Sequence, residues 1–296
     1  MQKKKEFLMV GIGEILWDML PRGKQLGGAP ANFAYHATQL GNKGVVVSCV
    51  GRDDDGVEIL KTLEKKEVGH YITSTDRYPT GVVTVSMDEQ GIPSYIIHED
   101  VAWDHLALNQ EHLDLAARAD VVCYGTLAQR NSDSAESIRI FLAHTSSECI
   151  RLFDINLRQN YYDRATILTL LQTATILKLN DEELLVVRGF LDLEGDETTV
   201  LEALCAAYDL DLIILTKGGQ GSRLFSPELG DSVFEGEAAL VVDTVGAGDS
   251  FAAAVATGLC LQLPLEKIHP FAAKVAAYVC GFSGATPELP PLEELL

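Results

Sequence analysis

Residues 243–249, DTVGAGD in one-letter code, combine two glycines and a carboxylate just before an apolar helical stretch. Glycine lets the backbone take conformations that a side chain forbids, and it lets a ligand approach the amides closely. Free N–H groups at the start of a helix, helped by the helix dipole, bind anions. The amides of Gly246, Ala247 and Gly248 could therefore hold a phosphoryl group, with Asp249 beside it as a base. The alternative is an ordinary glycine-rich turn in which Asp249 caps the helix.

Four other segments carry residue types suited to ligand binding. They are Gly27–Phe33 (GGAPANF), Asp154–Arg158 (DINLR), Asn180–Glu183 (NDEE) and Thr216–Gly221 (TKGGQG). In content, order and spacing, these segments and residues 243–249 resemble the signatures of the ribokinase/PfkB sugar kinase family, over nearly the whole chain. The resemblance implies one ribokinase-like domain over residues 1–296, a three-layer α/β sandwich with a mostly parallel central sheet and a small β-sheet lid.

Composition excludes several other classes of protein. The chain has 296 residues, is 47% hydrophobic and carries a formal net charge of −20, so it can bury a core but repels nucleic acid and anionic membranes. Its six cysteines show no C-x-x-C spacing, which predicts free thiols in a reducing compartment. No apolar run approaches the length of a membrane span, and Phe7–Ile12 after the N-terminal lysines indicates a strand and not a signal peptide. We therefore expect a cytoplasmic protein.

Alternating apolar runs and helical patterns predict a parallel sheet covered on both faces. The expected strands are Phe7–Gly13, Val45–Val50, Val121–Gly125, Arg151–Ile155, Thr175–Leu179 and Leu212–Thr216. The expected helices are Ala29–Leu40, Gly56–Lys66, Asp133–Ala143, Ala165–Leu171, Asp181–Val187, Thr198–Ala207, Phe251–Leu261 and Leu265–Cys280. Ligands bind beyond the carboxyl ends of such strands, where three of the motifs lie.

Residues 80–103 depart from this alternation of strands and helices. Gly81–Met87 and Ser94–His98, with a turn at residues 88–91, predict an antiparallel hairpin. The resemblance identifies it as the family's lid, to which residues 14–26 also contribute and which folds over the sugar. A lid sheet with an apolar face must cover the substrate, a partner subunit, or both. The resemblance implies a homodimer through the lid.

The resemblance further implies sugar contacts by Asp18, Gly28 and Asn32. Asp and Asn side chains suit the paired hydrogen bonds of vicinal hydroxyls. The alternatives are a turn residue for Asp18 and a surface helix residue for Asn32. Arg158 could reach the γ-phosphate or an anionic group of the substrate, or simply be an exposed arginine after a strand.

Two aromatic residues of the expected lid, Tyr95 and Trp103, could stack on a sugar ring or fill the apolar face of the lid. The lid stretch resembles that of fructokinases, and it contains no cluster of basic residues, which disfavours a phosphorylated acceptor. D-Fructose, phosphorylated at its 6-hydroxyl, is the expected substrate. Ribose, 2-keto-3-deoxygluconate or a nucleoside, or a non-catalytic sugar-binding regulator on the same fold, are the alternatives.

The resemblance assigns the nucleotide to Asn180 and to the loop residues Thr216, Gly218 and Gly221, with ATP as co-substrate. Glu183 would hold Mg²⁺ through water, since Mg²⁺ prefers oxygen ligands and keeps several waters. Asn followed three residues later by Glu is equally the pattern of a helix N-terminal capping box. Asp243 corresponds to a monovalent-cation site in many family members, but Val245 and Phe282 depart from the pattern of K⁺-dependent relatives.

Overall fold

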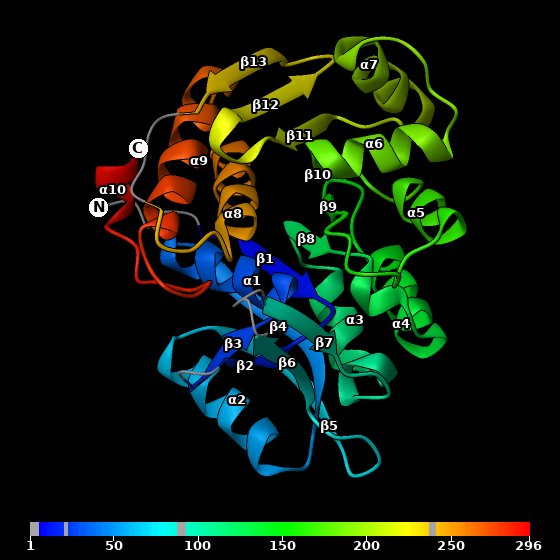
Figure 1. Ribbon diagram of the computed structural model, residues 1–296, viewed down its shortest axis with the longest axis vertical. Helices are drawn as coiled ribbons and strands as arrows, with labels where there is room; N and C mark the ends of the chain where they lie inside the picture. Colours follow the sequence, from blue (N-terminus) through cyan, green and yellow to red (C-terminus); the bar gives the residue numbers. More distant parts are fainter. Residues whose placement is uncertain (1–5, 21–22, 88–92, 237–240) are drawn as a thin grey trace.

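A nine-stranded sheet forms the centre of the protein in the computed structural model, which describes residues 6–20, 23–87, 93–236 and 241–296. The strand order is β13-β12-β11-β10-β9-β8-β1-β4-β5 (Figure 1). The parallel strands are β1 (Leu8–Ile12), β4 (Lys43–Gly51), β5 (Gly69–Thr75), β8 (Val121–Tyr124), β9 (Ile150–Asp154), β10 (Ile176–Asn180) and β11 (Leu212–Thr216). Two antiparallel strands, β12 (Gly221–Ser226) and β13 (Gly230–Glu235), extend one edge. All six predicted strands are confirmed.

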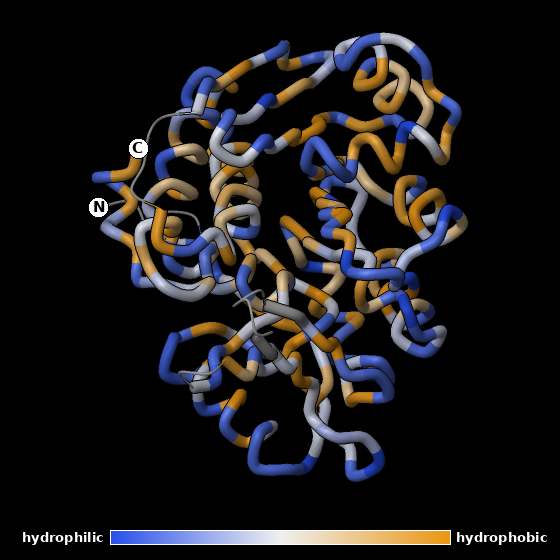
Figure 2. Tube along the Cα trace, viewed as in Figure 1, coloured by the Kyte–Doolittle hydropathy of each residue, from blue (hydrophilic) through white to orange (hydrophobic). Residues whose placement is uncertain are grey.

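Helices cover both faces of this sheet, which confirms the three-layer architecture (Figure 1). One apolar core lies under α3 (Gln110–Ala116), α4 (Ser132–Ala143), α5 (Arg164–Leu171), α6 (Asp181–Phe190) and α7 (Glu197–Tyr208). The other lies under α1 (Ala29–Gln39), α8 (Ala247–Cys260), α9 (Leu265–Cys280) and α10 (Leu292–Leu295). Figure 2 shows the apolar central strands between the polar outer loops. No helix in the described ranges is long and apolar enough to span a membrane.

A second, four-stranded sheet forms the lid, in the order β3-β2-β6-β7. Its strands are β2 (Leu16–Leu20), β3 (Gly23–Gly27), β6 (Gly81–Met87) and β7 (Pro93–Ile97). The hairpin β6–β7 is antiparallel as predicted, whereas β2 and β6 pair in parallel. The predicted turn at residues 88–91 lies outside the described residues. A small third core between the lid, α1 and α2 (Asp54–Lys65) anchors this sheet to the main body.

The lid ends earlier than the sequence predicted. After β7 the chain leaves the small sheet at Ile97 and forms a short 3-10 helix, η1 (Ala102–His105), which packs into the main core. Residues 98–103 therefore do not belong to the lid sheet. The physical reason is that Ala102 and Trp103 are 0% and 1% exposed, which an open lid cannot provide.

Candidate active site

Asp249 lies in the first turn of α8, the helix predicted to begin at the glycine-rich segment. The N-cap residue Gly246 has φ 79°, and a Cβ there would lie 2.5 Å from the carbonyl oxygen of Ala285, so glycine is required twice over. Among the described contacts no side chain caps this helix. The amide of Ala247 donates a 3.3 Å hydrogen bond to the carbonyl oxygen of Thr244. The predicted binding of an anion by the amides of Gly246, Ala247 and Gly248 stays a prediction.

The start of α1 meets the start of α8. Asn32, in the first turn of α1, donates a hydrogen bond of 2.8 Å from Nδ2 to Oδ2 of Asp249, across 217 positions of sequence. Gly28 is the N-cap of α1 with φ 110°, and a side chain there would collide with the carbonyl oxygen of Glu14. The structure therefore brings Gly28, Asn32 and Asp249 together, and the buried Asn32 is no surface residue.

The surroundings of Asp249 suit a base. Burial, and then the negative charge of Asp154, raise its pKa from 3.8 to about 6, while Lys178, the hydrogen bond from Asn32 and Arg158 act in the opposite direction. A base is most effective when its pKa lies near the working pH. Asp249 is thus ionised at neutral pH but more basic than an ordinary aspartate.

Asp18 of β2 belongs to the same cluster of charges. Burial raises its pKa to about 6, opposed by the charge of Arg158. The positive charge of the exposed Arg158 also acts to lower the pKa of Glu14 and Asp249, so one guanidinium acts on three carboxyl groups, from β2, from the segment between β1 and β2, and from the start of α8. This arrangement unites Asp18, Asn32, Arg158 and Asp249 on one side of the sheet, beyond the carboxyl ends of the strands.

Glu14 was not predicted as a site residue. Its side chain is 3% exposed, its Oε1 accepts a 3.3 Å hydrogen bond from the amide of Ala29, and its Oε2 has no partner within the described structure. Burial raises its pKa to about 7. The available signal was a lone glutamate inside an otherwise apolar stretch, residues 7–17, because a buried carboxyl group needs a reason to be there.

The predicted nucleotide residues lie at the ends of two neighbouring strands. Asn180 ends β10 and pairs in register with Thr216, which ends β11. Gly218, with φ 53°, faces open space, whereas a side chain on Gly221 would collide with the carbonyl oxygen of Phe234. Asn180, Thr216 and Gly218 thus lie at the carboxyl ends of β10 and β11, while Gly221 is required by the close approach of Phe234.

Glu183 forms the capping box with Asn180. Its Oε2 accepts a 2.8 Å bond from the amide of Asn180, and the Asn180 side chain accepts one of 2.8 Å from the Glu183 amide. Its Oε1 accepts a further 2.8 Å bond from the amide of Leu157, and the side chain is 6% exposed. Among the described residues no group of three or more His, Cys, Asp and Glu is placed to hold a metal. Each carboxylate oxygen of Glu183 thus already accepts one hydrogen bond from a backbone amide, and its role toward Mg²⁺ stays a prediction.

Asp243 connects two loops. Its carboxylate accepts a bond of 3.1 Å from the amide of Val245 and one of 3.0 Å from the amide of Gly284. These bonds tie the segment before α8 to the loop after α9. Each carboxylate oxygen of Asp243 thus accepts a hydrogen bond that holds the two segments together. A monovalent cation at Asp243 stays a prediction.

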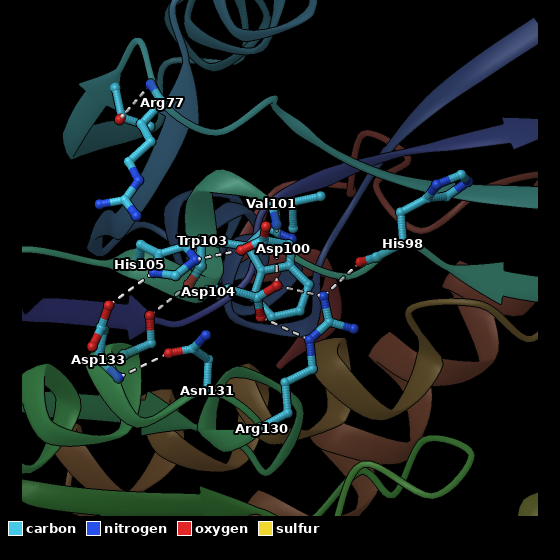
Figure 3. A network of polar contacts seen from close by, with 12 residues as sticks. Arg77, His98, Asp100, Val101, Trp103, Asp104, His105, Arg130, Asn131 and Asp133 are labelled. Atoms are coloured by element: carbon cyan, nitrogen blue, oxygen red, sulfur yellow. Dashed lines mark hydrogen bonds and ion pairs between the residues drawn. The ribbon is translucent and has the colours of Figure 1, made fainter.

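The two aromatic residues that were predicted for the lid differ in their surroundings. Tyr95 on β7 is 55% exposed, so its ring is accessible to a ligand. Trp103 is 1% exposed and lies in the main core, with the Arg130 guanidinium 4.1 Å from its ring centre (Figure 3). Arg130 in turn pairs with Asp104 at 2.7 and 2.8 Å. The prediction that Trp103 binds substrate is therefore wrong, because both the core and Arg130 cover its ring.

The comparison with known families agrees with this fold. Residues 22–291 match the family described as "pfkB family carbohydrate kinase", so the chain belongs to that family.

Individual relatives agree with this assignment. The sugar kinase PH1459 of Pyrococcus horikoshii has 30% sequence identity to this chain, over an alignment that covers 98% of this chain and 94% of that protein. Its crystal structure in complex with ATP superposes with a TM-score of 0.80 and 27% identity, covering 97% of this chain and 96% of that one. A fructokinase of Escherichia coli is 27% identical, over 96% of each chain.

Proposed function

We propose that the protein transfers the γ-phosphate of ATP to a hydroxyl of a free sugar, with D-fructose, at its 6-hydroxyl, as the preferred acceptor. The observation that carries this proposal is the 2.8 Å hydrogen bond between Asn32 and Asp249. It fixes a carboxylate of raised pKa between two helix starts, one for the sugar and one for the phosphate.

The reaction needs only groups that the site and ATP supply. The sugar oxygen forms a bond to the γ-phosphorus as its proton passes to the carboxylate of Asp249. The bond from that phosphorus to the bridging oxygen breaks, and ADP leaves. The amides of Gly246, Ala247 and Gly248 hold the negative charge of the transferring group. Mg²⁺ would enter with ATP, with Glu183 holding it through water, and it would offset the negative charge of the phosphates.

Sugar binding falls to Asp18, Asn32 and the amide of Gly28, under the lid strand that carries Tyr95. The choice of ATP is supported by the P. horikoshii relative, whose structure contains it. The choice of fructose is supported by the E. coli relative that is named fructokinase. Lys24 of β3 forms ion pairs with Asp55 and Glu58 at 2.6 and 2.7 Å, and these carboxylates would compete with an acceptor phosphate for it.

The test is ADP release from MgATP with free sugars, phosphosugars and nucleosides as acceptors. We expect kcat/KM for D-fructose to exceed that for ribose, 2-keto-3-deoxygluconate, nucleosides and fructose 6-phosphate. A higher value for another acceptor would reassign the substrate. No ADP release with any acceptor, while sugars still raise the melting temperature, would overturn the enzyme and indicate a sugar sensor.

A further inference from the structure

A buried ion pair lies directly behind the glycine-rich turn. Lys178 in β10 and Asp154 at the end of β9 are neighbours in register, and Nζ lies 2.9 Å from Oδ1. Their side chains are 8% and 4% exposed. The sequence predictions gave neither residue a role, although each belongs to or adjoins a family motif.

Gly248 lies directly beside this pair. Gly248 lies inside α8, and its φ is not in the left-handed region, so its backbone conformation does not require glycine. A Cβ added to Gly248 would lie 2.9 Å from the Nζ of Lys178. The absent side chain therefore leaves room for an ammonium group against the first turn that carries Asp249.

The ammonium group of Lys178 is surrounded mainly by negatively charged side chains. Burial acts to lower the pKa of Lys178, but Asp154, Asp249 and Glu183 together outweigh burial and raise it. The ionisable groups facing Asp249 or the pair are Glu14, Cys123, Asp154, Arg158, Lys178 and Glu183. Lys178 is the buried cation among them, held between carboxylates that compete for it.

We propose that Asp154 and Lys178 are a positioning pair for the catalytic turn. Lys178 supplies the positive charge that keeps Asp249 ionised, and Asp154 holds the ammonium behind Gly248 so that it does not pair directly with the base. A direct pair would make Asp249 a weaker base and keep it from the sugar hydroxyl. This inference rests on the proposed kinase function and deepens it.

A purely structural role makes a different prediction. If the pair only satisfied two buried groups and did not act on the base, removing either charge would change stability and leave the titration of Asp249 and the pH profile of kcat unmoved. The cleanest comparison is Asp154→Asn against Asp154→Asn/Lys178→Met, because residue 154 is neutral in both and they differ only in the ammonium. The double variant leaves no charge of the pair uncompensated, so it is expected to fold.

The experiment is a pH titration of the full chain by NMR with ¹³C-labelled aspartate carboxyls, in which the Asp249 signal is the one absent from Asp249→Asn. We expect Asp154→Asn to lower the midpoint of Asp249 by about one pH unit or more, since an opposite charge then acts unopposed. Adding Lys178→Met should raise the midpoint again by a similar amount. Equal midpoints in the two variants would overturn the proposal.

Kinetics separates this proposal from the proposed function. In Asp154→Asn the acid limb of kcat should move to lower pH and kcat at neutral pH should fall, with KM for ATP little changed. If the wild-type protein phosphorylates no acceptor, the proposed function fails, while the NMR titration still decides the role of the pair.

A second variant serves if Asp154→Asn does not fold. Gly248→Ala favours the helix and pushes Nζ away from the turn, so it should raise the midpoint of Asp249. The same substitution in Asp154→Asn/Lys178→Met should leave the midpoint unchanged, because no ammonium remains to be displaced. Equal effects in both backgrounds would also overturn the proposal.

Discussion

Replacing the base should make the protein inactive and more stable at the same time. We expect Asp249→Asn to lower kcat by about 10²–10⁴, the usual contribution of a positioned base. The amide of the new side chain is close to isosteric, and its oxygen can still accept the hydrogen bond from Asn32. A loss of turnover in this variant would therefore report lost chemistry and not a lost fold.

The gain in stability follows from the pKa of Asp249. Burial, and then Asp154, raise this pKa from 3.8 to about 6, so ionising the carboxyl costs the folded state about 3 kcal/mol at 1.36 kcal/mol per unit. This cost is absent below about pH 4, grows as the pH rises to about 6 and is complete above it. The variant escapes the cost but leaves Lys178 with one carboxylate fewer, so a net gain of about 1–3 kcal/mol is expected at pH 8.

The assay is denaturant unfolding of both proteins at pH 8 and pH 4, combined with ADP release. The difference in unfolding free energy should be present at pH 8 and largely vanish at pH 4. Asp54→Asn is the matched control, an exposed aspartate that also lies in the first turn of a helix, and it should change neither property. Unchanged turnover in Asp249→Asn, or a variant less stable than wild type at pH 8, would refute this reasoning.

Further predictions concern the charges, the sugar site and the lid. The kcat/KM of the wild-type enzyme should fall about tenfold per pH unit below about pH 6, because Asp249 then becomes protonated; a flat profile there would exclude it as the base. Asp18→Ala should raise KM for the sugar at least about tenfold, the cost of losing one hydrogen bond to a charged group, and leave KM for ATP unchanged. Arg130→Met should cost about 3–5 kcal/mol in urea unfolding, since it strands the buried Asp104, and a much smaller loss would contradict a buried pair. Ile96→Lys on the exposed face of β7 should convert a lid dimer into a 32.1 kDa monomer in light scattering; a wild-type monomer would exclude the dimer.

The parallel strands with an apolar run and the lid hairpin β6–β7 were predictable from the sequence, whereas three other strands of the large sheet were not. β10 and β11 read as apolar runs, and both were predicted within one residue of their observed ends. β5 is an edge strand whose residues are mostly half buried, so its sequence GHYITST lacks the apolar run on which the prediction depends. The antiparallel strands β12 and β13 were missed as well, although β12 is largely buried between β11 and β13.

The glycine-rich helix starts were also predictable from the sequence, because the backbone conformation that requires glycine is a local property. Gly246 and Gly28 both have positive φ and both lie where another backbone segment approaches closely. Trp103 shows the opposite case. Its place in the main core depends on where the chain leaves the lid after Ile97, and no local pattern records that turn.

The residues that sequence reasoning missed are those whose role is created by strand register. In the sequence, Lys178 interrupts the apolar run ILKLN. Its role can be inferred only from the structure, in which β9 places Asp154 beside it and α8 places Gly248 next to its ammonium group. Glu14 becomes intelligible only when Ala29 presents its amide to it. Burying three carboxyl groups around one ammonium opposes folding, so a fold selected for stability alone would not retain them. Their presence at the meeting point of two helix starts is therefore best explained by catalysis, in which a base must be both buried and ionised.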